Sequence, residues 1–232
     1  MARRFTTMVA AALLAVSAAP ILAQTKDNWD GLIRVKSKNI EMVYLLPQAD
    51  FRSYTKVMLD PSEVAFRKKW QRDQNSSRMD LSRRVSDEDA RKILDAAKEG
   101  LNKEFRKAYE KAGYQVVDAP GADVLRMRTA VINLDVAAPD IMSPGRSRTY
   151  SREAGGATLV LEARDSLSGQ ILGRAVDAQT TGDIGPYLRN SVTNAAEFED
   201  LFSSWAKASA NGLGKLKALS PIDPTGASLA RH

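Results

Sequence analysis

The chain has 232 residues, of which 44% are hydrophobic and 27% charged, and its formal net charge is +6. It contains no cysteine and a single histidine, His232, at the end of the sequence. Cys-His and Ser-His-Asp nucleophile systems and zinc sites built on Cys or His are therefore excluded, whereas carboxylate chemistry, Ser-Lys dyads and oxygen-ligand metal sites remain open.

Residues 1–23 have the pattern of a cleavable secretory signal peptide. A basic start precedes an uncharged apolar run over residues 8–23, and Ala23 is the expected last residue of the leader, with Gln24 following the cut. The run is shorter than the about 20 apolar residues of a membrane span, and Pro20 interrupts it. We expect cleavage, a periplasmic location and a mature chain without a transmembrane span.

The rest of the chain is expected to form an arm, one domain and a tail. Residues 24–42 are polar and without a long period, which predicts a flexible N-terminal arm. Residues 43–217 are expected to form a single α+β domain. Residues 218–232 contain several proline and glycine positions, which predict a flexible C-terminal tail.

The first elements of the domain are a strand and a long helix. Residues 54–59 predict a core strand that a turn ends. A helix is predicted from about Asp87 to Ala112, with Ser86 as its N-cap and Gly113 as its stop. Its apolar residues recur every three or four positions, as expected of one buried stripe: Ala90, Ile93, Leu94, Ala97, Leu101, Phe105, Ala108 and Ala112.

Strands follow this helix. Residues 123–136 alternate with period two, and residues 157–164 and 170–176 flank a tight turn that predicts a hairpin. A second amphipathic helix is predicted after the hairpin, with Asn194 and Glu197 as its capping box. These elements predict an α+β fold in which both long helices pack on one face of a mostly antiparallel sheet.

Two kinds of pattern could carry catalysis. Ser-x-x-Lys tetrads occur at residues 53–56 and 204–207, without the Ser-Asp-Asn and Lys-Thr-Gly elements that accompany such serines in penicillin-recognising enzymes. Two pairs of nearby acids could form an acid/base pair or a calcium site: Asp118 with Asp123, and Asp135 with Asp140. Since no calcium-loop motif accompanies them, we expect no catalytic residue, metal or cofactor. A carboxylate-based hydrolase is the alternative.

An arginine cluster in the connection over residues 137–156 is the candidate anion contact. Arg146, Arg148 and Arg152 lie close together in the sequence, with Tyr150 among them. Arginine presents a planar fork that suits carboxylate and phosphate, and tyrosine adds a flat apolar face. The alternative is a solvated loop whose arginines pair with nearby carboxylates.

Several segments share the motifs of a known family: Tyr44-Leu-Leu-Pro-Gln-Ala-Asp50, Tyr54-Thr-Lys-Val-Met-Leu-Asp-Pro61, Asp123-Val-Leu-Arg-Met-Arg128 and Asp165-Ser-Leu-Ser-Gly169. Over about residues 43–217 the chain resembles the bacterial envelope proteins of domain-of-unknown-function family 3313. The resemblance implies an exported protein of unassigned activity and supplies no catalytic residues. Members are often lipoproteins, whereas this chain has no cysteine to carry a lipid.

These observations predict an exported, non-catalytic envelope protein that binds another envelope protein or a cell-wall polymer. Nucleic acid is not expected as a partner, and the mildly basic charge leaves peripheral membrane contact open. A small-molecule carrier is a further alternative, which an apolar cavity would distinguish.

We predict that the mature protein begins at Gln24. Mass spectrometry of the N-terminal peptide from fractionated cells measures this, and an intact Met1 in the cytoplasmic fraction would contradict it.

Overall fold

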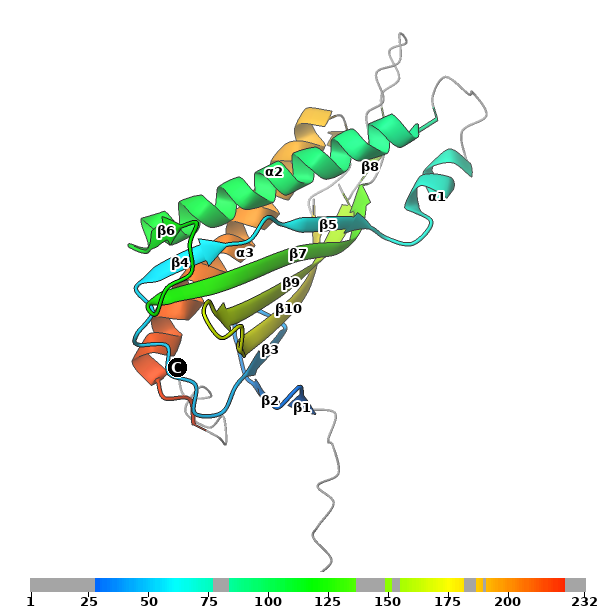
Figure 1. The fold of residues 1–232 in the computed structure, drawn as a ribbon. Helices are drawn as coiled ribbons and strands as arrows, with labels where there is room; N and C mark the ends of the chain where they lie inside the picture. Colours follow the sequence, from blue (N-terminus) through cyan, green and yellow to red (C-terminus); the bar gives the residue numbers. More distant parts are fainter. Residues whose placement is uncertain are drawn as a thin grey trace, which may run out of the picture.

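The computed structural model describes residues 28–76, 84–136, 149–151, 155–181, 187–189 and 191–223. In these parts, a nine-stranded sheet is covered on one face by two long helices, α2 (Asp87–Lys111) and α3 (Ser191–Leu219) (Figure 1). A short helix, α1 (Trp70–Ser76), precedes α2. The strands are β1 (Asn28–Trp29), β2 (Leu32–Val35), β3 (Met42–Leu45), β4 (Lys56–Leu59), β5 (Glu63–Phe66), β6 (Gln115–Val117), β7 (Val124–Val136), β8 (Thr149–Ser151), β9 (Gly155–Asp165), β10 (Ile171–Thr181) and β11 (Tyr187–Arg189).

The sheet has the order β1-β2-β3-β10-β9-β7-β4-β6, with β5 also paired to β7, while β8 and β11 form a separate pair. Neighbours from β1 to β7 are antiparallel, and β4 and β5 run parallel to β7. The parallel pairs arise because the chain crosses over through α2 before it returns to the sheet. The mostly antiparallel α+β fold expected from the sequence is confirmed.

The predicted hairpin is the centre of the sheet, formed by β9 and β10. The carboxylate of Asp165 fixes its turn, because Oδ1 accepts hydrogen bonds from the backbone N–H groups of Leu167 at 3.2 Å and Ser168 at 2.7 Å. Gly169 completes the turn at φ +71°, a left-handed conformation that favours glycine. The hairpin is longer than predicted, since both strands continue to the far end of the sheet.

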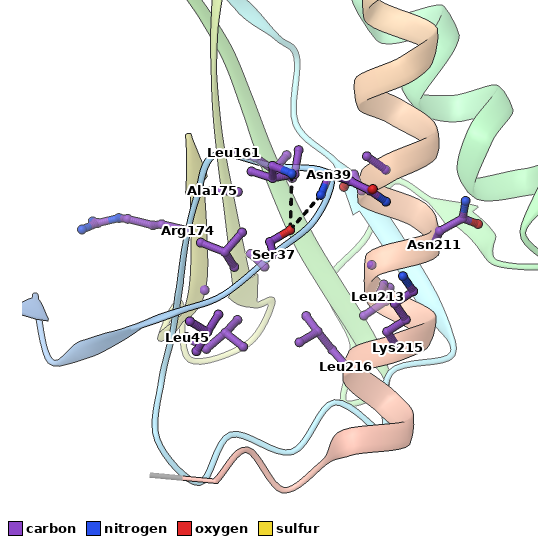
Figure 2. A pocket seen from close by; sticks show the side chains of 18 of the residues that line it. Ser37, Asn39, Leu45, Leu161, Arg174, Ala175, Asn211, Leu213, Lys215 and Leu216 are labelled. Carbon is purple, nitrogen blue, oxygen red and sulfur yellow. Dashed lines mark hydrogen bonds between the residues drawn. The ribbon is translucent and has the colours of Figure 1, made fainter. Parts of the chain in front are cut away.

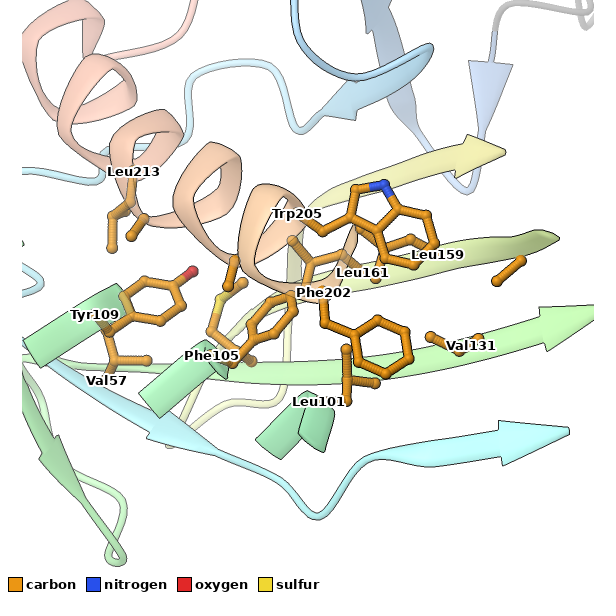
Figure 3. Close-up of a cluster of buried hydrophobic side chains, with 14 of the residues drawn as sticks. Val57, Leu101, Phe105, Tyr109, Val131, Leu159, Leu161, Phe202, Trp205 and Leu213 are labelled. Atoms are coloured by element: carbon orange, nitrogen blue, oxygen red, sulfur yellow. The ribbon is translucent and has the colours of Figure 1, made fainter. Parts of the chain in front are cut away.

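Helix α2 begins as predicted, with Ser86 as its N-cap. The Ser86 hydroxyl accepts from the Asp89 N–H at 3.1 Å, and the Asp89 carboxylate accepts from the Ser86 N–H at 3.0 Å, which completes a capping box. Its inner face buries Leu101, Phe105 and Tyr109 against the sheet and α3 (Figure 3). The predicted phase of this helix is therefore confirmed, except that Ala112, the last residue of the predicted stripe, is the exposed C-cap.

Helix α3 begins at Ser191, so the predicted capping box of Asn194 and Glu197 is wrong. No proline or glycine lies between Ser191 and Glu197 to end the helix there, and the helical run includes both residues. The inner face of α3 buries Phe202 and Trp205, which pack on the same core as α2 (Figure 3). Among the helices of the described residues, none is long and apolar enough to span a membrane.

Both ends of the predicted domain differ from expectation. The flexible arm expected over residues 24–42 contains β1 and β2, and Leu32 is fully buried. The expected C-terminal tail, residues 218–232, starts with an ordered segment, because Ile222 is fully buried and exchanges backbone hydrogen bonds with Gln48 and Ala49 at 2.9 Å. Single buried residues within polar sequence hold both segments, and such residues leave no periodic signal.

We predict that Leu101→Ala or Phe105→Ala lowers the free energy of unfolding by about 2–5 kcal/mol, because each empties a fully packed position. Lys103→Ala is the control. Lys103 pairs with Glu199 at 3.0 Å on the exposed side of α2, and such a pair contributes about 0–1 kcal/mol. Urea denaturation measures all three, and equal losses would contradict this packing.

Candidate ligand-binding cavity

A cavity of about 850 Å³ lies between the second half of α3, the inner face of the sheet and the loop of residues 36–41 that joins β2 to β3 (Figure 2). Its volume falls within the range of small-molecule sites, about 300–1,000 Å³. The cavity forms because the loop stands away from the end of α3, whereas α2 and the first half of α3 pack directly on the sheet.

The interior of the cavity is apolar. Residues from the sheet, from the segment between β3 and β4 and from α3 border it, and all but Leu216 are themselves buried: Leu45, Phe51, Met127, Leu161, Leu213 and Leu216. Figure 2 shows Leu45 and Leu161 facing Leu213 and Leu216 across the space. An apolar molecule that enters would therefore be removed from water on both sides.

Helix α3 presents small side chains to this space. Ala208, Ser209 and Gly212 lie along its wall. A Cβ atom on Gly212 would meet no heavy atom within 4 Å, so close packing does not require glycine here. Glycine inside a helix costs about 0.5–1 kcal/mol relative to alanine. At Gly212 the helix therefore has a less favourable residue than alanine, and the absence of a side chain leaves the cavity wall open.

Two anchors hold the loop of residues 36–41 in place. Within the loop, the Ser37 hydroxyl accepts from the N–H groups of Asn39 and Ile40, each at 3.3 Å (Figure 2). At its end, the Glu41 N–H donates to Asp177 Oδ1 at 2.9 Å. These bonds fix the outer wall of the cavity to the sheet.

Asp177 connects this loop to α3. It is buried on β10, and its Oδ2 accepts from Trp205 Nε1 at 2.7 Å and from Gln179 Nε2 at 3.1 Å. A buried carboxylate is stable only when hydrogen bonds replace water, and three donors do so here.

Three lysines line the cavity: Lys36, Lys38 and Lys215. All three are exposed, and none forms an ion pair with another described residue. In the described part of the chain, Glu41 is the only acidic residue that lines the cavity. The apolar interior therefore has a basic edge.

The two helices meet at the cavity wall through a hydroxyl pair. The Tyr109 hydroxyl and Ser209 Oγ lie 2.7 Å apart and share a hydrogen bond. Burial raises the pKa of Tyr109, so this hydroxyl stays neutral over the physiological range. Where α2 and α3 meet, the cavity wall therefore contains a neutral hydroxyl pair and, among the described residues, no charged group.

The outer face of the sheet carries a compensated charge network. Glu162 accepts from Arg174 Nε at 2.8 Å and also pairs with Arg164. Arg126 Nε donates to both carboxylate oxygens of Asp60, at 2.9 and 3.0 Å. Figure 2 shows Arg174 pointing away from the cavity, although its backbone contributes to the lining.

The predicted arginine contact cannot be placed. Arg146, Arg148 and Arg152 lie outside the described residues, as do the leader and its cleavage site at Ala23 and Gln24. The backbone of Tyr150 belongs to β8, opposite Leu188 of β11.

The acid pairs do not form a site in the described residues. The Asp123 carboxylate accepts from Thr55 Oγ1 at 2.6 Å, whereas Asp118 is almost fully exposed. Asp135 pairs with Arg67 at 2.6 Å, and Asp140 lies outside the described residues. Neither pair lines the cavity, and within the described ranges no group of three His, Asp or Glu side chains could hold a metal ion.

Sequence reasoning did not locate the residues of this cavity. Lys36 and Lys38 lie in the segment interpreted as a flexible arm, and Lys215 lies near the end of the second helix. The glycine at position 212 inside a helical pattern does not single out the cavity either, because Gly214 lies in the same helix and does not line it.

Comparison with known proteins identifies one family. The model of the family described as "Protein of unknown function (DUF3313)" matches residues 24–209, which confirms the resemblance found in the sequence. No curated protein matches the chain.

Several solved structures are similar at low identity. A DUF330 protein from Xanthomonas campestris is 13% identical with a TM-score of 0.38, covering 75% of this chain and 91% of its own. A putative neuraminyllactose-binding hemagglutinin homolog from Helicobacter pylori is 14% identical with a TM-score of 0.35, covering 75% and 95%. The PelC dodecamer from Paraburkholderia phytofirmans is 10% identical with a TM-score of 0.33, covering 71% and 96%. At these scores the similarities carry no functional conclusion.

The charge network on the outer face of the sheet should make the stability of the domain depend on pH through Glu162. Burial alone would raise the pKa of Glu162, but the hydrogen bonds from Arg164 and Arg174 outweigh burial and lower it. Because the pKa is lower in the folded chain, this carboxylate adds stability above its unfolded value of about 4.3, and that stability is lost as the pH falls through the folded value.

Glu162→Gln should therefore destabilise the domain by about 1–3 kcal/mol at pH 7, and the difference should shrink below about pH 4. Glu63→Gln is the control, since Glu63 is exposed and lies 3.6 Å from Arg128. It should change stability by at most about 1 kcal/mol. Urea denaturation across pH measures both, and an equal loss for Glu162→Gln at pH 3 and pH 7 would refute the assignment.

Proposed function

The chain is a member of the DUF3313 family, and we propose that it is an exported, non-catalytic protein that binds a small apolar or amphipathic molecule in the cavity between α3 and the loop of residues 36–41. The apolar cavity of about 850 Å³ carries this proposal. A small-molecule site is typically concave, mostly apolar and edged by a few polar groups, and this cavity has each of these properties.

The composition of the lining supports binding without turnover. A paired-carboxylate hydrolase needs two acids about 5–10 Å apart. In the described part of the chain, the cavity is lined by one acid, Glu41. The hydroxyls of Ser37 and Ser209 also line it, and each is hydrogen-bonded to backbone or to tyrosine. None of these groups is paired with a base that could activate it.

Export is supported by the leader pattern of residues 1–23 and by the start of the family match at residue 24. The match therefore begins where the mature protein is expected to begin. Binding to an envelope protein or a cell-wall polymer, which the leader, the single domain and the missing nucleophile systems suggest, remains the second hypothesis.

Gly212 provides a direct test. Gly212→Phe should fill the cavity, because its Cβ projects into open space on the cavity wall. We expect the unmodified protein to bind the neutral fluorescent probe N-phenyl-1-naphthylamine, and Gly212→Phe to weaken binding by about tenfold or more, equivalent to 1.4 kcal/mol. A fluorescence titration measures this.

Gly214→Phe is the matched control. Gly214 lies on the same helix with nothing within 4 Å of its Cβ position, but it does not line the cavity. This variant should bind the probe as the unmodified protein does. Equal probe binding by Gly212→Phe and Gly214→Phe, or no binding by any of the three proteins, would contradict the proposal.

A further inference from the structure

We infer that the molecule this cavity accepts is a single-chain anionic amphiphile, whose acyl chain lies in the apolar interior and whose carboxylate or phosphate head lies at the basic edge formed by Lys36, Lys38 and Lys215. This inference rests on the proposed function and adds the chemical class of the ligand.

The three lysines that line the cavity form no ion pair with a described residue. On the outer face of the sheet, Arg126, Arg164 and Arg174 are each paired with a carboxylate. The cavity lysines have no such partner among the described residues. Positive charges on the lining of one cavity attract an anion.

The three lysines come from two different walls of the cavity. Lys36 and Lys38 belong to the loop between β2 and β3, whereas Lys215 belongs to α3, and all three line the cavity. An anionic head between the two walls would therefore meet positive charge from both sides. Asn39 on the loop and Asn211 on α3 also line the cavity.

The interior of the cavity suits an apolar chain. The apolar part of the lining includes leucine, phenylalanine and methionine side chains, and Glu41 is the one acid among the lining residues of the described chain. A simple inorganic anion would leave this apolar surface unfilled, and a neutral hydrocarbon would leave the lysines unused. A molecule with an apolar chain and an anionic head matches both parts of the cavity.

Competition against N-phenyl-1-naphthylamine at low salt tests the class. Four competitors share one chain length and differ in the head: dodecanoate, dodecyl phosphate, dodecan-1-ol and dodecyltrimethylammonium. We expect both anions to displace the probe at concentrations about tenfold or more below those of the neutral and cationic molecules. The difference should shrink as salt rises, because exposed charges are screened over about 10 Å at 0.1 M.

The variant Lys36→Gln/Lys38→Gln/Lys215→Gln should keep probe binding and lose the preference for anions. The matched control replaces three exposed lysines that do not line the cavity: Lys68, Lys111 and Lys207. It lowers the net charge equally and should retain the preference.

The two anions separate the sources of the ligand. Tighter binding of dodecanoate indicates a free fatty acid, and tighter binding of dodecyl phosphate indicates a lysophospholipid-type head. Equal displacement by dodecan-1-ol and the anions would overturn the inference and leave the cavity as an apolar site. A loss of the preference in the control variant as large as in the cavity variant would overturn it too. Absence of probe binding would instead refute the proposed function itself.

Discussion

The buried carboxylate of Asp177 is the constraint on which the cavity depends. It accepts hydrogen bonds from Trp205 on α3 and from Glu41 at the end of the loop, while its own backbone belongs to β10. A charge in this position must keep its donors, because an unpaired buried carboxylate costs far more than one hydrogen bond contributes. One side chain therefore sets the distance between the helix, the sheet and the loop, and that distance leaves room for a ligand.

The two faces of the sheet differ in whether their basic side chains form ion pairs. Arginines on the outer face are matched by Asp60 and Glu162, which makes this face a stabilising network with no net attraction for an ion. Lysines at the cavity are unmatched within the described residues. Exposed lysines elsewhere, such as Lys68 and Lys111, also form no ion pair with a described residue, so the three cavity lysines differ from them in lining an apolar space. An anionic head bound there would neutralise their charge.

Periodic features of the fold could be predicted from the sequence. The apolar stripe that contains Leu101 and Phe105 predicted α2 and its buried face. Two strand-like segments on either side of a tight turn predicted the β9–β10 hairpin. Local side-chain chemistry also sufficed at Ser86, because a capping box needs only neighbours in sequence. These features arise from residues within a few positions of one another.

The cavity could not be predicted in this way, because residues far apart in the sequence create it. Leu32 and Ile222 are buried, yet each lies in a polar segment whose order depends on contacts with distant residues. Glu41 and Asp177 meet only after β3 pairs with β10. The lysines at positions 36 and 38 consequently looked like part of a solvated arm. Their proximity to Lys215 follows from tertiary structure alone.

Solution NMR of leucine methyl groups during titration with dodecanoate is the most direct measurement of the central claim, that the ligand enters between α3 and the sheet. The account predicts shifts at Leu45, Leu161 and Leu216, which line the cavity, and none at Leu134, which is buried in the core elsewhere. Shifts confined to the exposed Leu167, or no saturable shift at the cavity leucines, would contradict it.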